Sequence, residues 1–169
     1  GWTGSETPSV SSHLAEQFRG RFRALPIWPR LLTHFQVLDM LPIVRLHGDV
    51  KPEHLLVDAV DTVTVVDWEA IYRGPAVLDE ADIVFRILRE VVYANLTLTA
   101  ENLALLPWTH THMAALGWRI ALWLDRRHRT LTDPIASLVE RITQLPNEAQ
   151  PLDALVSIMR MARMEGTGY

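Results

Sequence analysis

The stretch LHGDVKPEHLLVDAVDTVTVVDWEA, residues 46–70, places ionisable side chains between short runs of Val and Leu. His47, Asp49, His54, Asp67 and Glu69 all fall within it. A carboxylate or an imidazole beside buried aliphatic residues is costly unless it is paired, hydrated or bound to something. The stretch therefore predicts a polar site carried by short strands.

Strand signals are confined to this part of the chain. The runs IVRL (43–46), HLLVD (54–58) and VTVVDW (63–68) are short and rich in aliphatic and β-branched residues, which is typical of strands. Four residues, AVDT, separate the last two runs. This spacing predicts a β-hairpin between them.

Apolar residues at helical spacing occupy the rest of the chain and predict helices before and after the strands. The predicted helices are 8–25, 26–41, 78–95, one through Trp118–Leu124, one that begins at Pro134 after an Asp133 cap, and one that begins at Pro151. The expected fold class is therefore α+β and mainly α.

Composition limits the class of protein. With 169 residues, 49% of them hydrophobic and 21% charged, the chain can fill one core, and we expect a single domain over 1–169. The 16 basic against 20 acidic residues argue against a nucleic-acid partner. The chain has no cysteine, which excludes disulfides and Cys-based zinc sites and fits a cytoplasmic location. No apolar run is long enough to span a membrane, and the first residues lack the charged and apolar regions of a signal peptide.

Two carboxylates at the ends of strands that flank a short hairpin suit phosphoryl transfer. That reaction needs one carboxylate to orient the attacking hydroxyl and accept its proton, and another to hold the magnesium ion that bridges the nucleotide phosphates. Magnesium prefers oxygen ligands, so Asp67 is the candidate metal ligand. Glu69, two residues along, lies on the same side if the strand continues. Asp49 is then the candidate base.

At these residues the chain resembles the aminoglycoside phosphotransferase family, a branch of the protein-kinase-like fold. HGDVKPEH is similar to the family's catalytic loop, VVDWE to its metal-binding Asp segment, and GPAVLDEA to the Gly- and Pro-containing stretch that ends in Asp-x-Ala. The resemblance implies an ATP- or GTP-dependent kinase, a transferase that uses Mg²⁺. It implies that Asp49 is the catalytic base, that Asp67 and His54 bind the metal, and that His47 and Asp79 support the catalytic loop.

Three residues of the stretch have an alternative interpretation. His54 stands where the family has Asn, and an imidazole nitrogen is a poorer magnesium ligand than an amide oxygen, so a histidine that only holds backbone fits as well. Lys51 follows the base as in the DLKPEN loop of protein Ser/Thr kinases, which predicts a phosphate contact, and a solvated lysine is the alternative. Trp68 is expected either to contact the nucleotide or to pack in the core.

The resemblance is to a kinase-like C-terminal lobe, in which a small β-hairpin carries the site beside a helical bundle. No Gly-rich phosphate loop precedes His47, so the N-terminal nucleotide lobe is expected to be absent from this chain. We expect the surface left open near Phe18, Phe22, Trp28 and Trp68 to self-associate or to bind a separate protein.

The resemblance leaves the acceptor open. The hydroxyl can belong to a small molecule, such as an antibiotic or a metabolite, or to a peptide Ser or Thr. A non-catalytic module that binds a partner protein or peptide is the alternative to an enzyme.

Other polar residues of the helical segments predict no site. Glu80, Asp82 and Glu90 are expected on the solvated face of the helix after the hairpin. His110 and His112 are two residues apart and lack partners at metal-ligand spacing.

Overall fold

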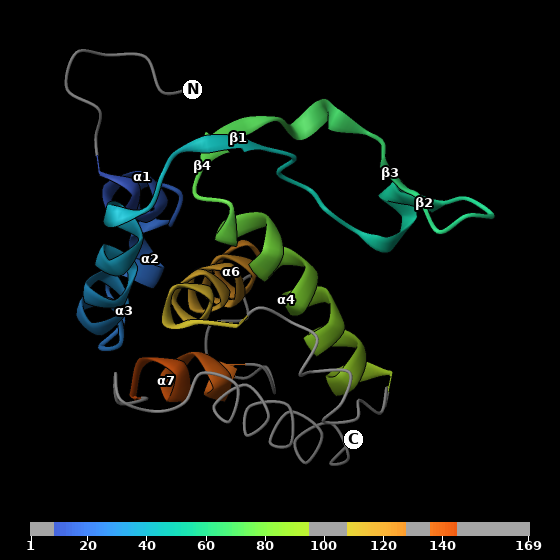
Figure 1. The fold of residues 1–169 in the computed structure, drawn as a ribbon. Helices are drawn as coiled ribbons and strands as arrows, with labels where there is room; N and C mark the ends of the chain where they lie inside the picture. The colour runs from blue at the N-terminus through green and yellow to red at the C-terminus, as the bar shows by residue number, and fades with distance from the viewer. Residues whose placement is uncertain (1–8, 95–107, 128–135, 145–169) are drawn as a thin grey trace.

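Helical spacing on both sides of the strands becomes helix in the computed structural model, which describes residues 9–94, 108–127 and 136–144 (Figure 1). Most described residues are helical, and the strands are short and antiparallel, so the α+β, mainly α class is confirmed. In chain order the described elements are α1 (Val10–Glu16), α2 (Gly20–Arg23), α3 (Trp28–Phe35), the 3₁₀ helix η1 (Gln36–Met40), β1 (Val44–Leu46), the 3₁₀ helix η2 (Pro52–His54), β2 (Leu55–Val57), β3 (Val63–Val65), the 3₁₀ helix η3 (Trp68–Ala70), β4 (Tyr72–Gly74), α4 (Val77–Tyr93), α6 (His110–Arg127) and α7 (Ala136–Gln144).

The first predicted helix is two helices, α1 and α2, although its apolar positions are buried at the expected spacing. Arg19, between them, has an extended backbone with φ −77° and ψ 155°. Its N–H donates to Asp125 Oδ2 of α6 at a distance of 3.0 Å. Periodicity could not predict this break, because the group that holds it is 106 residues away in the sequence.

The second predicted helix is α3 followed by the tighter turns of η1. Leu31, Phe35 and Leu38 are fully buried on one side of both segments, as the helical spacing predicts. Asp39 of η1 accepts hydrogen bonds from the Ser11 N–H at 2.7 Å and from the Ser11 hydroxyl at 2.8 Å. These bonds tie η1 to the first turn of α1.

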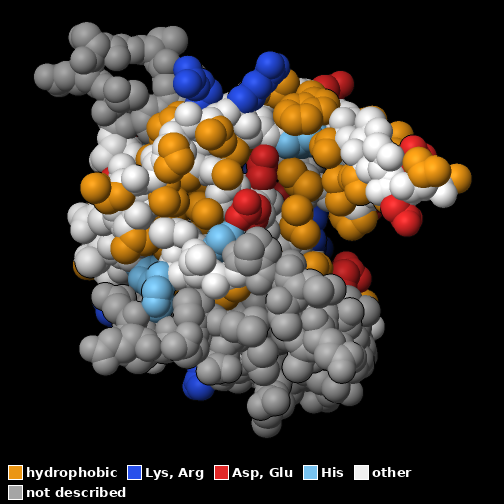
Figure 2. Space-filling view, in the orientation of Figure 1, with side chains coloured by type: hydrophobic (Ala, Val, Ile, Leu, Met, Phe, Trp, Pro, Cys, Tyr) orange, Lys and Arg blue, Asp and Glu red, His pale blue; other side chains and the backbone are white. Residues whose placement is uncertain are grey.

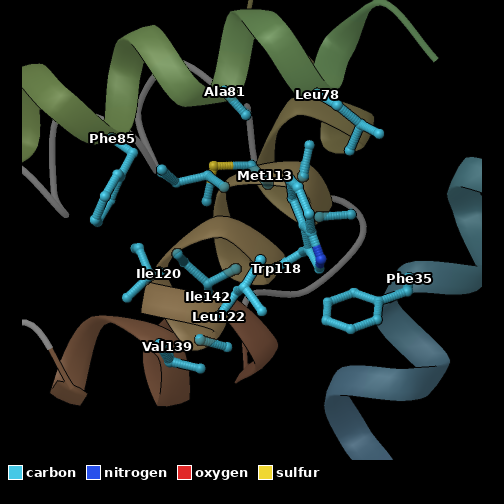
Figure 3. Close-up of a cluster of buried hydrophobic side chains, with 14 of the residues drawn as sticks. Phe35, Leu78, Ala81, Phe85, Met113, Trp118, Ile120, Leu122, Val139 and Ile142 are labelled. Atoms are coloured by element: carbon cyan, nitrogen blue, oxygen red, sulfur yellow. The ribbon is translucent and has the colours of Figure 1, made fainter. Parts of the chain in front are cut away.

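The core lies where α4, α6 and α7 meet α3 (Figure 3). α4 packs along α6, and α6 also contacts α3 and α7. α6 is buried on nearly all sides, as expected of a central helix that others surround. The core residues labelled in Figure 3 are Phe35, Leu78, Ala81, Phe85, Met113, Trp118, Ile120, Leu122, Val139 and Ile142.

Two antiparallel two-stranded sheets lie beside the helices, and the β2–β3 hairpin projects away from them (Figure 1). β2 pairs with β3, with Leu55 opposite Val65, so the predicted hairpin is confirmed. β1 pairs with β4, and Leu46 lies opposite Tyr72. The sequence analysis missed β4, because Tyr72–Gly74 lacks the aliphatic and β-branched run that predicted the other strands.

Phe18 and Phe22 are buried, with exposed fractions of 4% and 1%, so the prediction that they form an open surface is wrong. Both rings pack against Trp28, which is itself half-buried. Large exposed apolar side chains lie instead on the hairpin and the turn that follows it, the part that projects to the right in Figure 2. They are Leu56, Val57, Val60, Val63 and Trp68.

Asp82 is buried, so the prediction that it lies on a solvated face of α4 is wrong for this residue. It forms ion pairs with Arg86 of α4 and Arg119 of α6. Glu80 contacts the buried imidazole of His112 at the start of α6. Polar contacts as well as the apolar core therefore join α4 to α6.

Two sequence predictions lie outside the described residues. The Asp133 cap with Pro134, and the helix predicted to begin at Pro151, belong to these parts of the chain. Within the described ranges, no helix combines the length and the apolarity that crossing a membrane requires.

Replacing Phe22 by Ala should lower the free energy of unfolding by about 3–5 kcal/mol, because a fully buried aromatic ring is removed. Met40 is 88% exposed and provides the control, since Met40→Ala should change the same quantity by less than about 0.5 kcal/mol. Urea unfolding followed by tryptophan fluorescence measures both variants. Equal, small losses for the two variants would contradict the placement of Phe22 in the core.

Candidate active site

The loop after β1 is held by one carboxylate from the first turn of α4. Asp79 Oδ2 accepts the backbone N–H of His47 at 2.7 Å, and Asp79 Oδ1 accepts the N–H of Gly48 at 3.0 Å. Two charge-assisted bonds to consecutive amides fix the direction in which the loop leaves the strand. The structure thus brings Asp79 to the loop residues that it was predicted to support.

Gly48 has a left-handed backbone with φ +85°. A Cβ at this position would lie 2.4 Å from the carbonyl oxygen of Ala70 and 2.8 Å from the Tyr72 ring. Only glycine fits, because both the conformation and the space exclude a side chain. The loop can therefore turn directly beneath the segment that leads into β4.

His47 joins the same loop to the end of the hairpin. Its Nε2–H donates to the carbonyl of Val66 at 2.7 Å, and its Nδ1 accepts the N–H of Asp49 at 3.3 Å. This pattern requires the hydrogen on Nε2 and the lone pair on Nδ1. The buried imidazole therefore orients the backbone on both sides of the candidate base.

Asp49 presents a partly exposed carboxylate between two cations. Lys51 Nζ lies 3.1 Å from its Oδ2, and an Arg86 Nη lies 2.6 Å from its Oδ1. Burial acts to raise the pKa of Asp49, but the hydrogen bond from Lys51 and the charges of Arg86, Lys51 and His54 outweigh it and lower the pKa below its ordinary value. Asp49 is therefore ionised at neutral pH, as a proton acceptor must be.

Asp67 lies at the end of the hairpin and faces His54. Its backbone is left-handed, with φ 63° and ψ 57°, which stops β3 and starts η3. Asp67 Oδ2 lies 2.7 Å from Nε2 of the buried His54, whose Nδ1–H donates to the carbonyl of Asp49 at 3.0 Å. His54 thereby connects the carboxylate of Asp67 to the backbone of Asp49.

A magnesium ion fits Asp67 better than it fits His54. The carboxylate of Asp67 is 43% exposed, whereas both ring nitrogens of His54 already face oxygen atoms of the protein. Magnesium commonly takes one or two protein carboxylates and completes its shell with water and substrate phosphates. In the part of the chain that the structure describes, no three His, Cys, Asp or Glu residues gather as a metal cage. The geometry thus suits the alternative interpretation of His54, a histidine that holds backbone.

The strand does not continue to Glu69, so the condition under which Glu69 would share a side with Asp67 is not met. β3 ends at Val65, and Glu69 lies in η3, where side chains do not alternate between two faces. Trp68, in the same turn, is 45% exposed, and its indole N–H donates to the Val65 carbonyl at 2.8 Å. Its ring lies 4.9 Å from the His47 ring, which places it beside the loop after β1.

The sequence analysis missed Arg86, which the fold brings to the candidate base. Arg86 follows Asp82 by four residues on α4, a spacing at which opposite charges pair on a helix. That spacing could have predicted the pair. It could not predict Asp49 as the third member, because Asp49 is 37 residues away from Arg86 in the sequence.

A cavity of about 610 Å³ opens between residues 51–55 and α4. It adjoins Asp49, because Lys51 and Arg86 both line the cavity and contact that carboxylate. The wall combines aliphatic side chains with charges of both signs. Its residues are Lys51, Pro52, Glu53, Leu55, Ile83, Arg86, Ile87, Arg89 and Glu90.

The family model of the phosphotransferase enzyme family (APH) matches residues 6–116 of the chain. The matched residues include both sheets, the loop after β1 and α4. No curated protein and no solved structure matches the chain. The match confirms the resemblance that the motifs within residues 46–81 indicate.

Asp79→Ala should lower the free energy of unfolding by about 2–3 kcal/mol, because two backbone N–H groups of the loop lose a charged acceptor. Asp79→Asn should cost less, since one amide oxygen can still accept. Glu90→Ala, an exposed change on the same helix, is the control and should stay within about 0.5 kcal/mol. Denaturant unfolding compares the three variants, and an Asp79→Ala loss no larger than that of Glu90→Ala would remove Asp79 as the brace.

Proposed function

Because the chain belongs to the phosphotransferase enzyme family, we propose that it carries the catalytic residues for transfer of the γ-phosphoryl group of ATP to a hydroxyl group. In this proposal the described residues are the counterpart of the C-terminal lobe of a kinase-like fold. The supporting observation is the arrangement of Asp49 and Asp67. One carboxylate stands on a loop braced by Asp79, the other on the adjoining hairpin end, and His54 contacts both residues.

Asp49 acts as the base in this reaction. The acceptor hydroxyl donates its hydrogen bond to the carboxylate, which orients the oxygen towards the γ-phosphorus. A bond forms between that oxygen and phosphorus, and the bond from phosphorus to the β,γ-bridging oxygen breaks, so ADP leaves with the electron pair. The hydroxyl proton passes to Asp49 and then to solvent, to which the partly exposed carboxylate has access.

Asp67 and Lys51 serve the phosphates. Asp67 is the residue that would hold Mg²⁺, which when bound neutralises charge on the nucleotide phosphates. Lys51 is about one-third exposed and sits beside the base, so its ammonium can reach the transferred group and balance its negative charge. Trp68 offers an exposed ring at the same edge for contact with the nucleotide.

The acceptor is a small molecule or a Ser or Thr side chain that enters beside α4. The cavity next to Lys51 and Arg86 supports this direction of approach, because it adjoins the base. Its aliphatic wall can cover a hydrocarbon body, and its charges can bind polar groups of either sign.

A second candidate function is a non-catalytic module that binds a protein or peptide, or a second copy of the chain. The observation in its favour is the β2–β3 hairpin, which exposes Leu56, Val57, Val60 and Val63. Apolar side chains gathered in this way mark surfaces that another molecule covers. The two functions differ in one measurable respect, since the module alone would show no magnesium-dependent turnover of ATP.

Asp49→Asn should lower the turnover number about 10²–10⁴-fold, because the amide cannot accept the proton. Phosphate release from Mg-ATP with water as the acceptor measures it in the full-length protein without knowledge of the natural acceptor. The fold should be retained, since an Asn oxygen can still accept from Arg86. Asp58→Asn changes an exposed hairpin carboxylate and should leave turnover within about twofold. Normal turnover by Asp49→Asn would exclude this residue as the base.

A further inference from the structure

The two cations on Asp49 differ in how firmly the protein holds them. Arg86 contacts Oδ1, and its side chain is only 22% exposed, whereas Lys51 contacts Oδ2 with a side chain that is 32% exposed. Both oxygens of the candidate base are therefore engaged. Each oxygen can still accept a second hydrogen bond, and an acceptor hydroxyl approaches most easily the oxygen whose cation can move aside.

Arg86 is anchored from a second side by Asp82. Asp82 Oδ2 lies 3.3 Å from Arg86 Nε and 3.2 Å from the same Nη that contacts Asp49. The Asp82 side chain is only 8% exposed, and its other oxygen, Oδ1, pairs with Arg119 of α6. Arg119 in turn lies over the Phe85 ring, 4.8 Å from its centroid. The packing of α4 on α6 thus fixes the position of Arg86.

Lys51 has no such anchor. Among the described residues, no carboxylate other than that of Asp49 pairs with its ammonium group. A partly exposed ion pair on a long flexible side chain contributes little, so it breaks easily. Arg86 is held instead by the largely buried Asp82, which keeps its guanidinium beside Asp49.

We propose that Arg86 is a positioning residue that holds Oδ1 of Asp49, so that Oδ2 is the oxygen that receives the acceptor hydroxyl when Lys51 moves to the phosphates. This inference rests on the proposed function, because it assigns the orientation of the same base. Asp82 acts through Arg86. The three residues form a chain from the core of the protein to the reacting group.

A carboxylate that rotates freely would present its lone pairs in many directions. Turnover depends on a hydroxyl held within hydrogen-bond distance of the base and aligned for attack, and a misplacement of about 1 Å can cost roughly 10²-fold in rate. Loss of Arg86 should therefore affect the chemical step. It should not affect nucleotide binding, because Arg86 contacts only Asp49 and Asp82 among the described charged groups.

The test measures turnover of Mg-ATP, with water as the acceptor, in the full-length protein. Arg86→Gln should lower kcat about 10–100-fold and leave KM for Mg-ATP within about twofold. Arg86→Lys should recover part of kcat, because it restores the charge but not the fork that bonds both carboxylates. Asp82→Asn should lower kcat in the same direction as Arg86→Gln.

Arg45→Gln is the control, since Arg45 is an exposed arginine of β1 that does not line the cavity or pair with Asp49. It should leave kcat within about twofold. In the double variant Asp49→Asn with Arg86→Gln, kcat should equal that of Asp49→Asn alone, because Arg86 acts only through the base. A raised KM with unchanged kcat, a multiplicative loss in the double variant, or equal losses for Arg86→Gln and Arg45→Gln would each overturn the proposal.

Failure of the proposed function gives a different result. If the unmodified protein releases no phosphate from Mg-ATP, the kinase assignment fails. Thermal unfolding of the unmodified protein, Asp49→Asn, Arg86→Gln and their double variant then decides on Arg86. The shifts in Tm caused by Asp49→Asn and Arg86→Gln should be less than additive if Arg86 holds Asp49. Strictly additive shifts would overturn the positioning role independently of any activity.

Discussion

Two hydrogen bonds from consecutive backbone amides to one carboxylate determine how the rest of the site is placed. Asp79 receives the N–H groups of His47 and Gly48, so the loop after β1 leaves the strand at a fixed angle above α4. A loop of this length has many conformations when free, and a charged acceptor selects the one in which both amides point at it. Every later contact of Asp49 depends on that selection.

α4 serves as the reference for the site because three of its polar side chains follow one another at helical spacing. Asp79 in the first turn holds the loop, Asp82 is buried against α6, and Arg86 reaches the candidate base. Residues three and four apart share a helix face. One face of α4 therefore contacts the loop, then the core, and then the carboxylate of Asp49. The packing of α4 on α6 is thereby coupled to the orientation of Asp49.

The hairpin contributes the second carboxylate and a surface that faces outward. Asp67 takes a left-handed conformation that ends β3 and turns its side chain to His54. Backbone of this kind is uncommon for a residue with a side chain, although Asp tolerates it better than most, and it is often found where function requires it. On its strands, before Asp67 in the sequence, the hairpin exposes Leu56, Val57 and Val63, which the described helices do not cover.

The sequence by itself determined the class of the fold, the β2–β3 hairpin and the family, because these depend on local patterns. Helical spacing requires only neighbours within a few turns, and the HGDVKPEH and VVDWE segments are continuous in the chain. The same patterns place Asp49, Asp67 and Asp79 as candidates, and the fold brings all three into one network of contacts.

Only the tertiary structure decided which polar groups meet across long separations. The break at Arg19 is held by Asp125, β1 pairs with β4, and the partner of Asp49 is Arg86. It also decided burial. It placed Phe22 in the core, although the expected absence of a lobe predicted an open surface there, and it placed Asp82 beneath the site, although the helical pattern predicted a solvated face. Such contacts depend on how helices pack against each other. The packed residues are far apart in the sequence, so a periodic pattern along the chain does not reveal which of them meet.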